Sequence, residues 1–307
     1  MAGSDRVDRA RRTFVAGALG LAAGAAAASA RGSDAASAPL ETRPIPASGE
    51  RIGRVGLGTW RGLSLGERES SRAVLQRFHA LGGRVVDTSP MYGDAEEAIG
   101  TLGEELGVLP GLFLATKVWT RGRREGERQV ERSFRLLRRD PIDLIQVHNL
   151  LDLETQLPLL RRLKEAGRIR YLGITHYLAS AHDELARVLE REPIDFLQVN
   201  YSAIDRAAER RLLPLAAGRG VAVLANQPFA EGRLFSRVRG QALPAWASEW
   251  DCASWGQLFL KFILGHPAIT CVIPGTLNPR HVEDNLGAAR GRLPEAGERE
   301  RLAQLLG

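Results

Sequence analysis

Residues suited to acid–base chemistry stand at the ends of three successive apolar segments of this chain. Asp87 and Tyr92 follow the first segment in the sequence DTSPMYG. The second segment, FLATKVW, carries Lys117 near its end, and the third, DLIQVHN, carries His148. A phenol can protonate a carbonyl oxygen, an ammonium can lower the pKa of that phenol, and a carboxylate can keep the ammonium charged. An imidazole can orient the substrate oxygen, so the four residue types together predict a carbonyl reductase.

The lysine count strengthens this interpretation. Lys117, Lys164 and Lys261 are the only lysines among 42 basic residues of the Lys and Arg types. Lys164 and Lys261 fit helices, whereas Lys117 lies in an apolar segment, where a compact ammonium differs in function from a guanidinium. Each candidate taken alone has a structural alternative: a lysine reaching solvent, a packed tyrosine or a core histidine. Their occurrence together favours a site.

Eight short apolar segments alternate with amphipathic stretches and predict a parallel sheet covered by helices. They span residues 54–60, 84–89, 112–119, 143–149, 171–177, 195–201, 221–229 and 270–276. Eight such units in about 250 residues predict a closed (β/α)8 TIM barrel, with an open doubly wound sheet as the alternative. The carboxyl ends of barrel strands meet on one face, which would bring the four candidates together.

Two further segments flank this pattern. RPIPASGERIG, before the first strand, predicts an N-terminal hairpin that covers the bottom of the barrel. Residues 231–254 form an insertion, and Trp246, Trp250 and Trp255 lie in or beside it. The insertion is either a lid over a pocket or a surface segment held by aromatic packing.

The motifs DTSPMYG, ATKVW, QVHN and IPGTLNPRHVEDNLGAA, in this order, resemble those of the aldo-keto reductases. GLGTW and QVNYS add to the resemblance, which covers about residues 43–289. It implies a (β/α)8 barrel that reduces an aldehyde or ketone with NAD(P)H. It also implies that Asp87, Tyr92, Lys117 and His148 form the catalytic tetrad, with Tyr92 the proton donor.

The resemblance extends to the cofactor contacts. NADP(H) is the expected cofactor, with NAD(H) as the alternative. Asn226 stands where the family has an aromatic residue that stacks on the nicotinamide, so Phe229 is the candidate substitute. The expected cofactor-binding residues are Thr175, His176, Gln198, Phe229, Gly275, Thr276, Arg280, His281 and Asn285. Gly275 and Thr276 begin a turn into a helix whose first amides suit an anion.

The amino-terminal residues predict export. Arg11 and Arg12 precede Thr13-Phe14, an Ala/Gly-rich stretch and a small-x-small site at Ala28–Ala30. This pattern is typical of a signal peptide of the twin-arginine type over residues 1–30, rather than of a stable membrane span. An ordinary signal peptide with a chance arginine pair is the alternative. Residues 31–45 would form a flexible linker and residues 46–307 the barrel. We therefore expect a periplasmic bacterial protein with the twin-arginine export machinery as a partner.

The remaining features limit the function. No basic run is interleaved with aromatic residues, so nucleic-acid binding is not indicated. Cys252 and Cys271, the only cysteines, match no zinc spacing with His266, and their pairing stays open. Two alternatives to a reductase remain: a nucleotide-binding sensor or regulatory barrel with little turnover, and a hydrolase or lyase that uses Asp87 and His148 without nucleotide.

Overall fold

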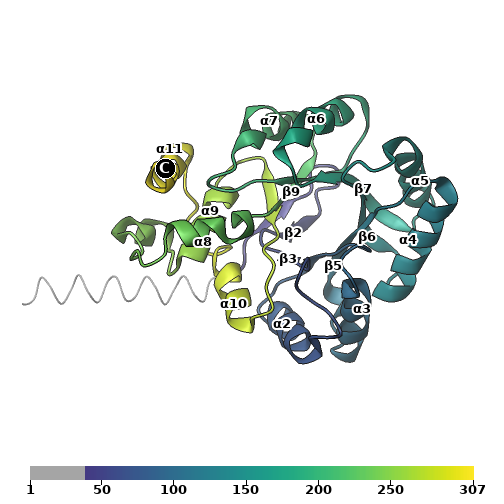
Figure 1. Cartoon of the computed structure of the whole chain (residues 1–307), viewed down its shortest axis with the longest axis horizontal. Coiled ribbons are helices and arrows are strands. Elements are labelled where there is room, and N and C mark those ends of the chain that lie inside the picture. Colours follow the sequence, from purple (N-terminus) through teal and green to yellow (C-terminus); the bar gives the residue numbers. More distant parts are fainter. Residues whose placement is uncertain (1–38) are drawn as a thin grey trace, which may run out of the picture. The chain divides into compact units, whose positions relative to one another are not determined.

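Eight parallel strands form the centre of the computed structural model, which describes residues 39–307 (Figure 1). Each strand pairs with its neighbours in chain order, from β3 to β10. Bridges between Val55 and Val272 and between Gly58 and Gly275 join the two ends of the sheet, which confirms the predicted barrel. The strands are β3 (Leu57–Gly58), β4 (Val85–Asp87), β5 (Phe113–Val118), β6 (Ile142–His148), β7 (Ile169–His176), β8 (Phe196–Asn200), β9 (Ala222–Asn226) and β10 (Ile269–Val272).

Helices follow the strands and cover the outside of the barrel (Figure 1). In α4, the buried residues Val130, Phe134 and Leu137 recur three or four positions apart, which places them on one face against the sheet. The helices are α2 (Arg68–Ala80), α3 (Ala95–Glu105), α4 (Arg123–Leu137), α5 (Leu153–Glu165), α6 (His182–Arg191), α7 (Leu212–Gly218), α8 (Arg233–Arg237), α9 (Trp255–Leu264), α10 (Pro279–Gly287) and α11 (Ala296–Leu306). Within residues 39–307, no helix has both the length and the apolar character of a membrane span.

A hairpin of β1 (Thr42–Pro44) and β2 (Arg51–Gly53) precedes the barrel, as the sequence predicted. Ile45 and Ile52 are buried in the same cluster as the apolar side chains that fill the barrel interior. The Ser48 hydroxyl lies 2.7 Å from the hydroxyl of Tyr171, which also belongs to that cluster. The hairpin therefore closes the end of the barrel where the strands begin.

Alternate residues of each strand point into the barrel, and these inward positions change from apolar to polar along the strand. In β5, Phe113 and Ala115 belong to the interior cluster, and the next inward residue is Lys117. The same two-residue step leads to polar side chains in the neighbouring strands: Asp87, His148, Thr175, Gln198 and Asn226. The carboxyl ends of the strands thus carry a polar layer on top of an apolar core, which is the layered packing expected of such a barrel.

Glycine is required where this layer meets the backbone. A Cβ atom on Gly173 would lie 2.7 Å from the carbonyl oxygen of Phe196 and 3.0 Å from Cγ of Gln146. Any larger residue would push β7 away from β8 or displace the Gln146 side chain. The absence of a side chain at this position leaves room for the polar layer.

Trp246 and Trp250 of the insertion pack on each other, and Trp255 is the first residue of α9. Trp250 is 1% exposed, and its ring centroid lies 5.2 Å from that of Trp246. Trp255 stacks on Phe259 of α9 with 5.7 Å between centroids. None of the three lines the cavity described below. The geometry favours a surface segment held by aromatic packing over a lid, although Glu231 and Gly232 at its start do line the cavity.

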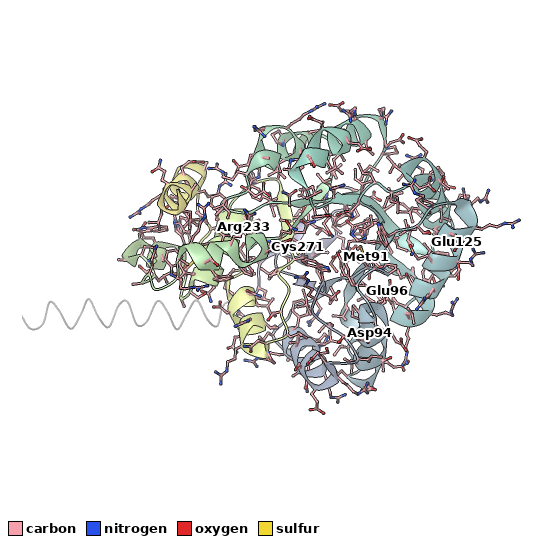
Figure 2. All side chains as sticks on the ribbon, in the orientation of Figure 1. Met91, Asp94, Glu96, Glu125, Arg233 and Cys271 are labelled. Atoms are coloured by element: carbon pink, nitrogen blue, oxygen red, sulfur yellow. The ribbon has the colours of Figure 1, made fainter. Side chains whose placement is uncertain are left out.

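Both cysteines are free and buried. Cys271 belongs to the interior cluster, as predicted for a small buried hydrophobic residue (Figure 2). In the part of the chain that the structure describes, no group of three or more His, Cys, Asp and Glu side chains is arranged to hold a metal ion. The predicted signal peptide and residues 31–38 of the predicted linker lie outside the described residues, whereas residues 42–44 of that linker form β1.

Candidate active site

A buried ion pair between Lys117 and Asp87 is the central feature of the polar layer. Lys117 Nζ donates to Asp87 Oδ2 and to the carbonyl of Thr88, both at 2.7 Å. Lys117 is 0% exposed and Asp87 is 2% exposed. Burial alone would lower the pKa of Lys117, but the attraction of Asp87 and Tyr92 outweighs it and raises this pKa. Lys117 is therefore a permanent cation inside the barrel mouth.

Tyr92 lies beside this cation, in the turn between β4 and α3. Its amide donates to the carbonyl of Ser89 at 3.0 Å, and Lys117 Nζ lies 4.9 Å from its ring centroid. Burial raises the pKa of Tyr92, and the Lys117 ammonium offsets this only in part. Lys117 lowers this pKa, as expected, but the net pKa is raised because lost hydration disfavours the phenolate more strongly. The phenol keeps its proton at neutral pH, and the ammonium stabilises the phenolate when the proton leaves.

His148 completes the group of four. Its ring meets the Tyr92 ring edge-on at 84°, with 5.9 Å between centroids, and lies 6.4 Å from the ring of Trp119. Burial, reinforced by the charge of Lys117, lowers the pKa of His148 to about 2. The imidazole is therefore neutral, with one N–H to donate.

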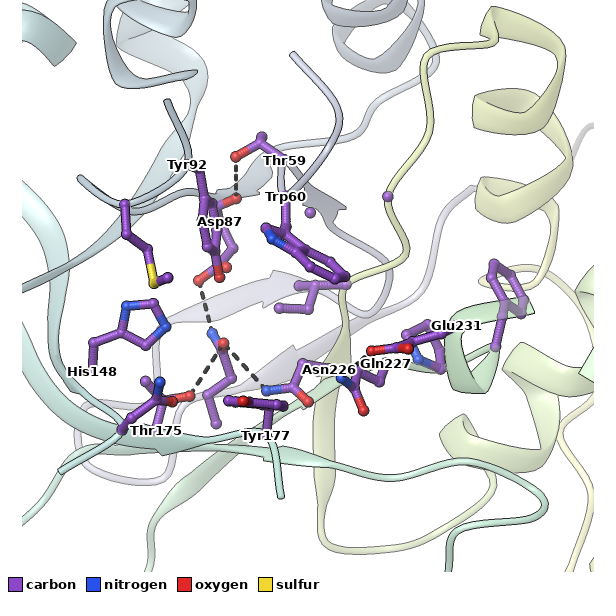
Figure 3. A pocket seen from close by; sticks show the side chains of 18 of the residues that line it. Thr59, Trp60, Asp87, Tyr92, His148, Thr175, Tyr177, Asn226, Gln227 and Glu231 are labelled. Carbon is purple, nitrogen blue, oxygen red and sulfur yellow. Dashed lines mark hydrogen bonds between the residues drawn. The ribbon is translucent and has the colours of Figure 1, made fainter. Parts of the chain in front are cut away.

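Amide side chains lie beside Asp87 on the floor of a cavity, where Figure 3 also shows Thr175 and Asn226. Gln198 Nε2 donates to Asp87 Oδ1 at 2.7 Å, and Gln198 Oε1 accepts from Thr175 Oγ1 at 3.3 Å. The Oδ1 atoms of Asn149 and Asn226 are buried and have no hydrogen-bond partner among residues 39–307. A buried acceptor without a donor is unfavourable, so both oxygens suit a ligand that donates hydrogen bonds.

A cavity of about 640 Å³ opens at the carboxyl ends of the strands. Lys117 does not line it, but the other polar side chains described above do: Asp87, Tyr92, His148, Asn149, Thr175, Gln198 and Asn226. Trp60, Met91, Trp119 and Tyr177 also line it and are 40–46% exposed. The apolar side chains surround the mouth, whereas the polar layer forms the floor. The shape suits a small molecule whose polar group reaches Tyr92 and His148.

The predicted nicotinamide contacts divide into two groups. Thr175, Gln198 and Phe229 line the cavity. His176 does not: its Nδ1 accepts from the Leu178 amide at 3.1 Å, and its ring stacks on Tyr177 with 5.6 Å between centroids. The imidazole of His176, one of the expected cofactor contacts, is thus occupied outside the cavity.

The predicted phosphate loop joins β10 to α10. Gly275 lines the cavity, and Thr276 Oγ1 lies 3.3 Å from Nδ1 of His281. Asn278 caps α10 by accepting from the Arg280 amide at 3.0 Å. Arg280 and His281 are exposed at this helix start, whereas Asn285 is buried within α10. The Arg280, His281 and Val282 amides all donate to Asn278, so the group that suits an anion here is the exposed Arg280 side chain at the start of the helix.

Sequence reasoning missed several residues of the site. Gln146 Nε2 lies 3.4 Å from Asp87 Oδ1, and the two-residue alternation back from His148 could have identified it. The mouth residues also had a signal, because an aromatic residue lies one or two positions after each of three alternate strands: Trp60, Trp119 and Tyr177. Asn149 and Ser89 had none, since their roles depend on contacts between different strands.

Comparisons with known proteins agree with this geometry. The model of the aldo/keto reductase family matches residues 54–298. The chain is 28% identical to aldo-keto reductase str7 of Strobilurus tenacellus, over 84% of this chain and 89% of the relative. It is also 28% identical to the methylglyoxal reductase YeaE of Escherichia coli, over 84% and 93%. A crystal structure of an aldo-keto reductase from Klebsiella pneumoniae in complex with NADPH superposes with a TM-score of 0.74 at 26% identity, covering 88% of this chain and 96% of that one.

Proposed function

We propose that Tyr92 is the proton donor in the reaction of this enzyme. The chain belongs to the aldo/keto reductase family and reduces aldehydes or ketones with NAD(P)H. The single observation that carries this proposal is the buried Lys117–Asp87 pair against the Tyr92 ring. A phenol with a raised pKa holds its proton at neutral pH, and a fixed cation lowers the energy of the phenolate that forms. His148, kept neutral by burial, donates a hydrogen bond to the same substrate oxygen.

The floor of the cavity fits a nicotinamide carboxamide. Its amino group would donate to the orphaned acceptor Asn226 Oδ1. Its oxygen would accept from the Thr175 hydroxyl, which would turn away from Gln198 Oε1 to reach it. The reduced nicotinamide supplies the hydride that adds to the carbonyl carbon. Phe229 would pack on the ring, and His176 would have to leave Leu178 to take part.

The phosphate end of the cofactor would lie on the loop before α10. Gly275 and Thr276 would face the pyrophosphate. Arg280 and His281 would bind the 2′-phosphate of NADP(H), and Asn285 would lie near the adenine. The exposed Arg280 favours NADP(H) over NAD(H), because the two differ only in this phosphate.

During the reaction, the proton moves from the Tyr92 hydroxyl to the carbonyl oxygen. The resulting phenolate is stabilised by Lys117, whose charge is held in place by Asp87. The C=O bond becomes CH–OH, and bulk water returns a proton to Tyr92 through the open mouth. The aromatic side chains around the mouth exclude water from the carbonyl while the substrate is bound.

Measuring turnover distinguishes this proposal from the alternative of a nucleotide-binding sensor with little turnover. No observation favours that alternative. Purified protein with NADPH should oxidise the nucleotide and form one alcohol per NADPH on a panel of small aldehydes and ketones. Methylglyoxal belongs in that panel, since relatives include methylglyoxal reductases. Tight NADPH binding without alcohol formation on any carbonyl would contradict the enzymatic proposal.

We further propose that the protein is exported to the periplasm by the twin-arginine machinery, through the signal sequence in residues 1–30. This rests on Arg11 and Arg12 and on the small-x-small site at residues 28–30. A pathway for folded proteins would let the barrel bind its nucleotide before export. Changing both arginines to lysine should leave active precursor in the cytoplasm. Normal export of that double variant would refute the route.

A further inference from the structure

Ser89 contacts both of the groups that face the substrate oxygen. Its carbonyl accepts from the Tyr92 amide at 3.0 Å, and its hydroxyl oxygen lies 3.1 Å from Nδ1 of His148. The same hydroxyl oxygen accepts from the Met91 amide at 3.3 Å. Ser89 is 0% exposed, so water does not compete for these contacts. One buried residue therefore joins the turn that carries Tyr92 to the imidazole of His148.

The direction of the hydroxyl–imidazole hydrogen bond follows from the available partners. The Met91 amide can only donate, so it uses a lone pair of Ser89 Oγ. Among residues 39–307, Nδ1 of His148 is the one acceptor within hydrogen-bond distance of that hydroxyl. If Nδ1 carried the proton, the hydroxyl proton would be buried without an acceptor, which is unfavourable. Ser89 therefore donates and Nδ1 accepts.

This contact settles which nitrogen of His148 faces the substrate as a donor. The ring is held between Tyr92 and Trp119, and a neutral imidazole has a single N–H. Because Nδ1 accepts the hydrogen bond from Ser89, Nε2 is the nitrogen of His148 that is available to a ligand in the cavity. In the opposite tautomer, a lone pair of Nε2 would face the lone pairs of the carbonyl oxygen. The two acceptors would repel each other.

We propose that Ser89 is a positioning residue that selects the Nε2–H tautomer of His148 and so makes the imidazole a hydrogen-bond donor to the substrate carbonyl. The consequence for the reaction rests on the proposed role of His148. The tautomer itself does not depend on that role. The two statements can therefore fail separately.

The tautomer can be measured without substrate by ¹⁵N NMR on full-length protein labelled at histidine. The chain has six histidines, and a His148→Asn variant assigns the signal. We expect Nε2 to be of the protonated type and Nδ1 of the unprotonated type in the wild type, and a second, Nδ1-protonated form in Ser89→Ala. A wild-type protein with the proton on Nδ1, or a Ser89→Ala protein with an unchanged tautomer, would overturn the proposal.

Kinetics supply the second readout. Loss of one positioning hydrogen bond should reduce kcat of Ser89→Ala by roughly two- to tenfold, with NADPH affinity unchanged. Ser89→Thr keeps the hydroxyl and should keep both the tautomer and the rate. The matched control is Ser133→Ala, which removes another buried hydroxyl, one that donates to the Gln129 carbonyl at 3.2 Å on α4. An equal loss of kcat in Ser133→Ala would assign the effect to packing and contradict a role for Ser89.

Discussion

Replacing Lys117 with methionine should destabilise the fold far more than the same replacement of Lys164. Both lysines pair with an aspartate at nearly the same distance: Lys117 Nζ lies 2.7 Å from Asp87, and Lys164 Nζ lies 2.6 Å from Asp195. The pairs differ in burial. The side chains of the first are 0% and 3% exposed, and those of the second are 39% and 11% exposed. The comparison therefore isolates the effect of removing water.

The expected magnitudes follow from that difference. Removing one partner of a buried pair leaves an uncompensated charge and costs about 3–5 kcal/mol, whereas a pair whose lysine stays in solvent contributes about 0–1 kcal/mol. Asp195 is itself buried, but it keeps the Leu172 amide as a donor at 2.9 Å when Lys164 is replaced. Gln198 and Gln146 still donate to Asp87 in the variant, at 2.7 and 3.4 Å in the wild type. We therefore expect the lower end for Lys117→Met, about 3 kcal/mol, and at most about 1 kcal/mol for Lys164→Met.

Urea unfolding at neutral pH, followed by tryptophan fluorescence, measures both free energies of unfolding. The double variant Asp87→Asn/Lys117→Met removes both charges and should recover part of the loss, because no unpaired ion remains. Equal destabilisation by Lys117→Met and Lys164→Met would refute the burial argument. A double variant less stable than Lys117→Met would show that the isolated carboxylate is not the cause.

Three further predictions concern the proton donor, a buried carboxyl and the nucleotide. Tyr92→Phe should lower the rate of carbonyl reduction by about 10²–10⁴ while NADPH binding persists; wild-type turnover would exclude Tyr92 as the donor. Burial raises the pKa of Glu96, so its contribution to stability is present at low pH and is lost as the pH rises. Glu96→Gln should therefore raise the free energy of unfolding at pH 8 but not at pH 4, unlike Glu97→Gln at the exposed neighbouring position, and a pH-independent difference would contradict this. Arg280→Ala should weaken NADPH binding about tenfold and leave NADH binding unchanged in fluorescence titrations, and an equal loss for both would place the 2′-phosphate elsewhere.

The sequence predicted the fold and the position of the acid–base residues because both depend on local patterns. Each strand is a short apolar run, and a polar residue at its end has no place in an apolar core. Asp87, Lys117 and His148 each occupy such an end. Once eight runs predict a barrel, the convergence of these residues needs no further information.

Properties that depend on depth and on contacts between strands could not be predicted in this way. The sequence places a cation near Tyr92 and so suggests a lowered pKa, yet burial reverses the net direction. The hydroxyl of Ser89 becomes important only because β4 and β6 bring it to His148. Three tryptophans lie within ten residues in and beside the insertion, but only the folded chain shows that Trp246 packs on Trp250 and that Trp255 stacks on Phe259 of α9.

The scarcity of lysine in the sequence points to buried cationic sites in general, and not only to the site of Lys117. Lys261 is also 0% exposed, and its ammonium donates to three backbone carbonyls, those of Trp250, Arg290 and Arg292. Three converging acceptors match the three donors of an ammonium, whereas a planar guanidinium offers five donors in a rigid fork. In a chain that uses arginine at nearly every cationic position, two of the three lysines thus occupy buried sites that only a compact cation fits. Lys164, on the surface of α5, is the exception. Lysine at such positions reflects the shape of the site, and Lys261→Arg should therefore destabilise the protein although it preserves the charge.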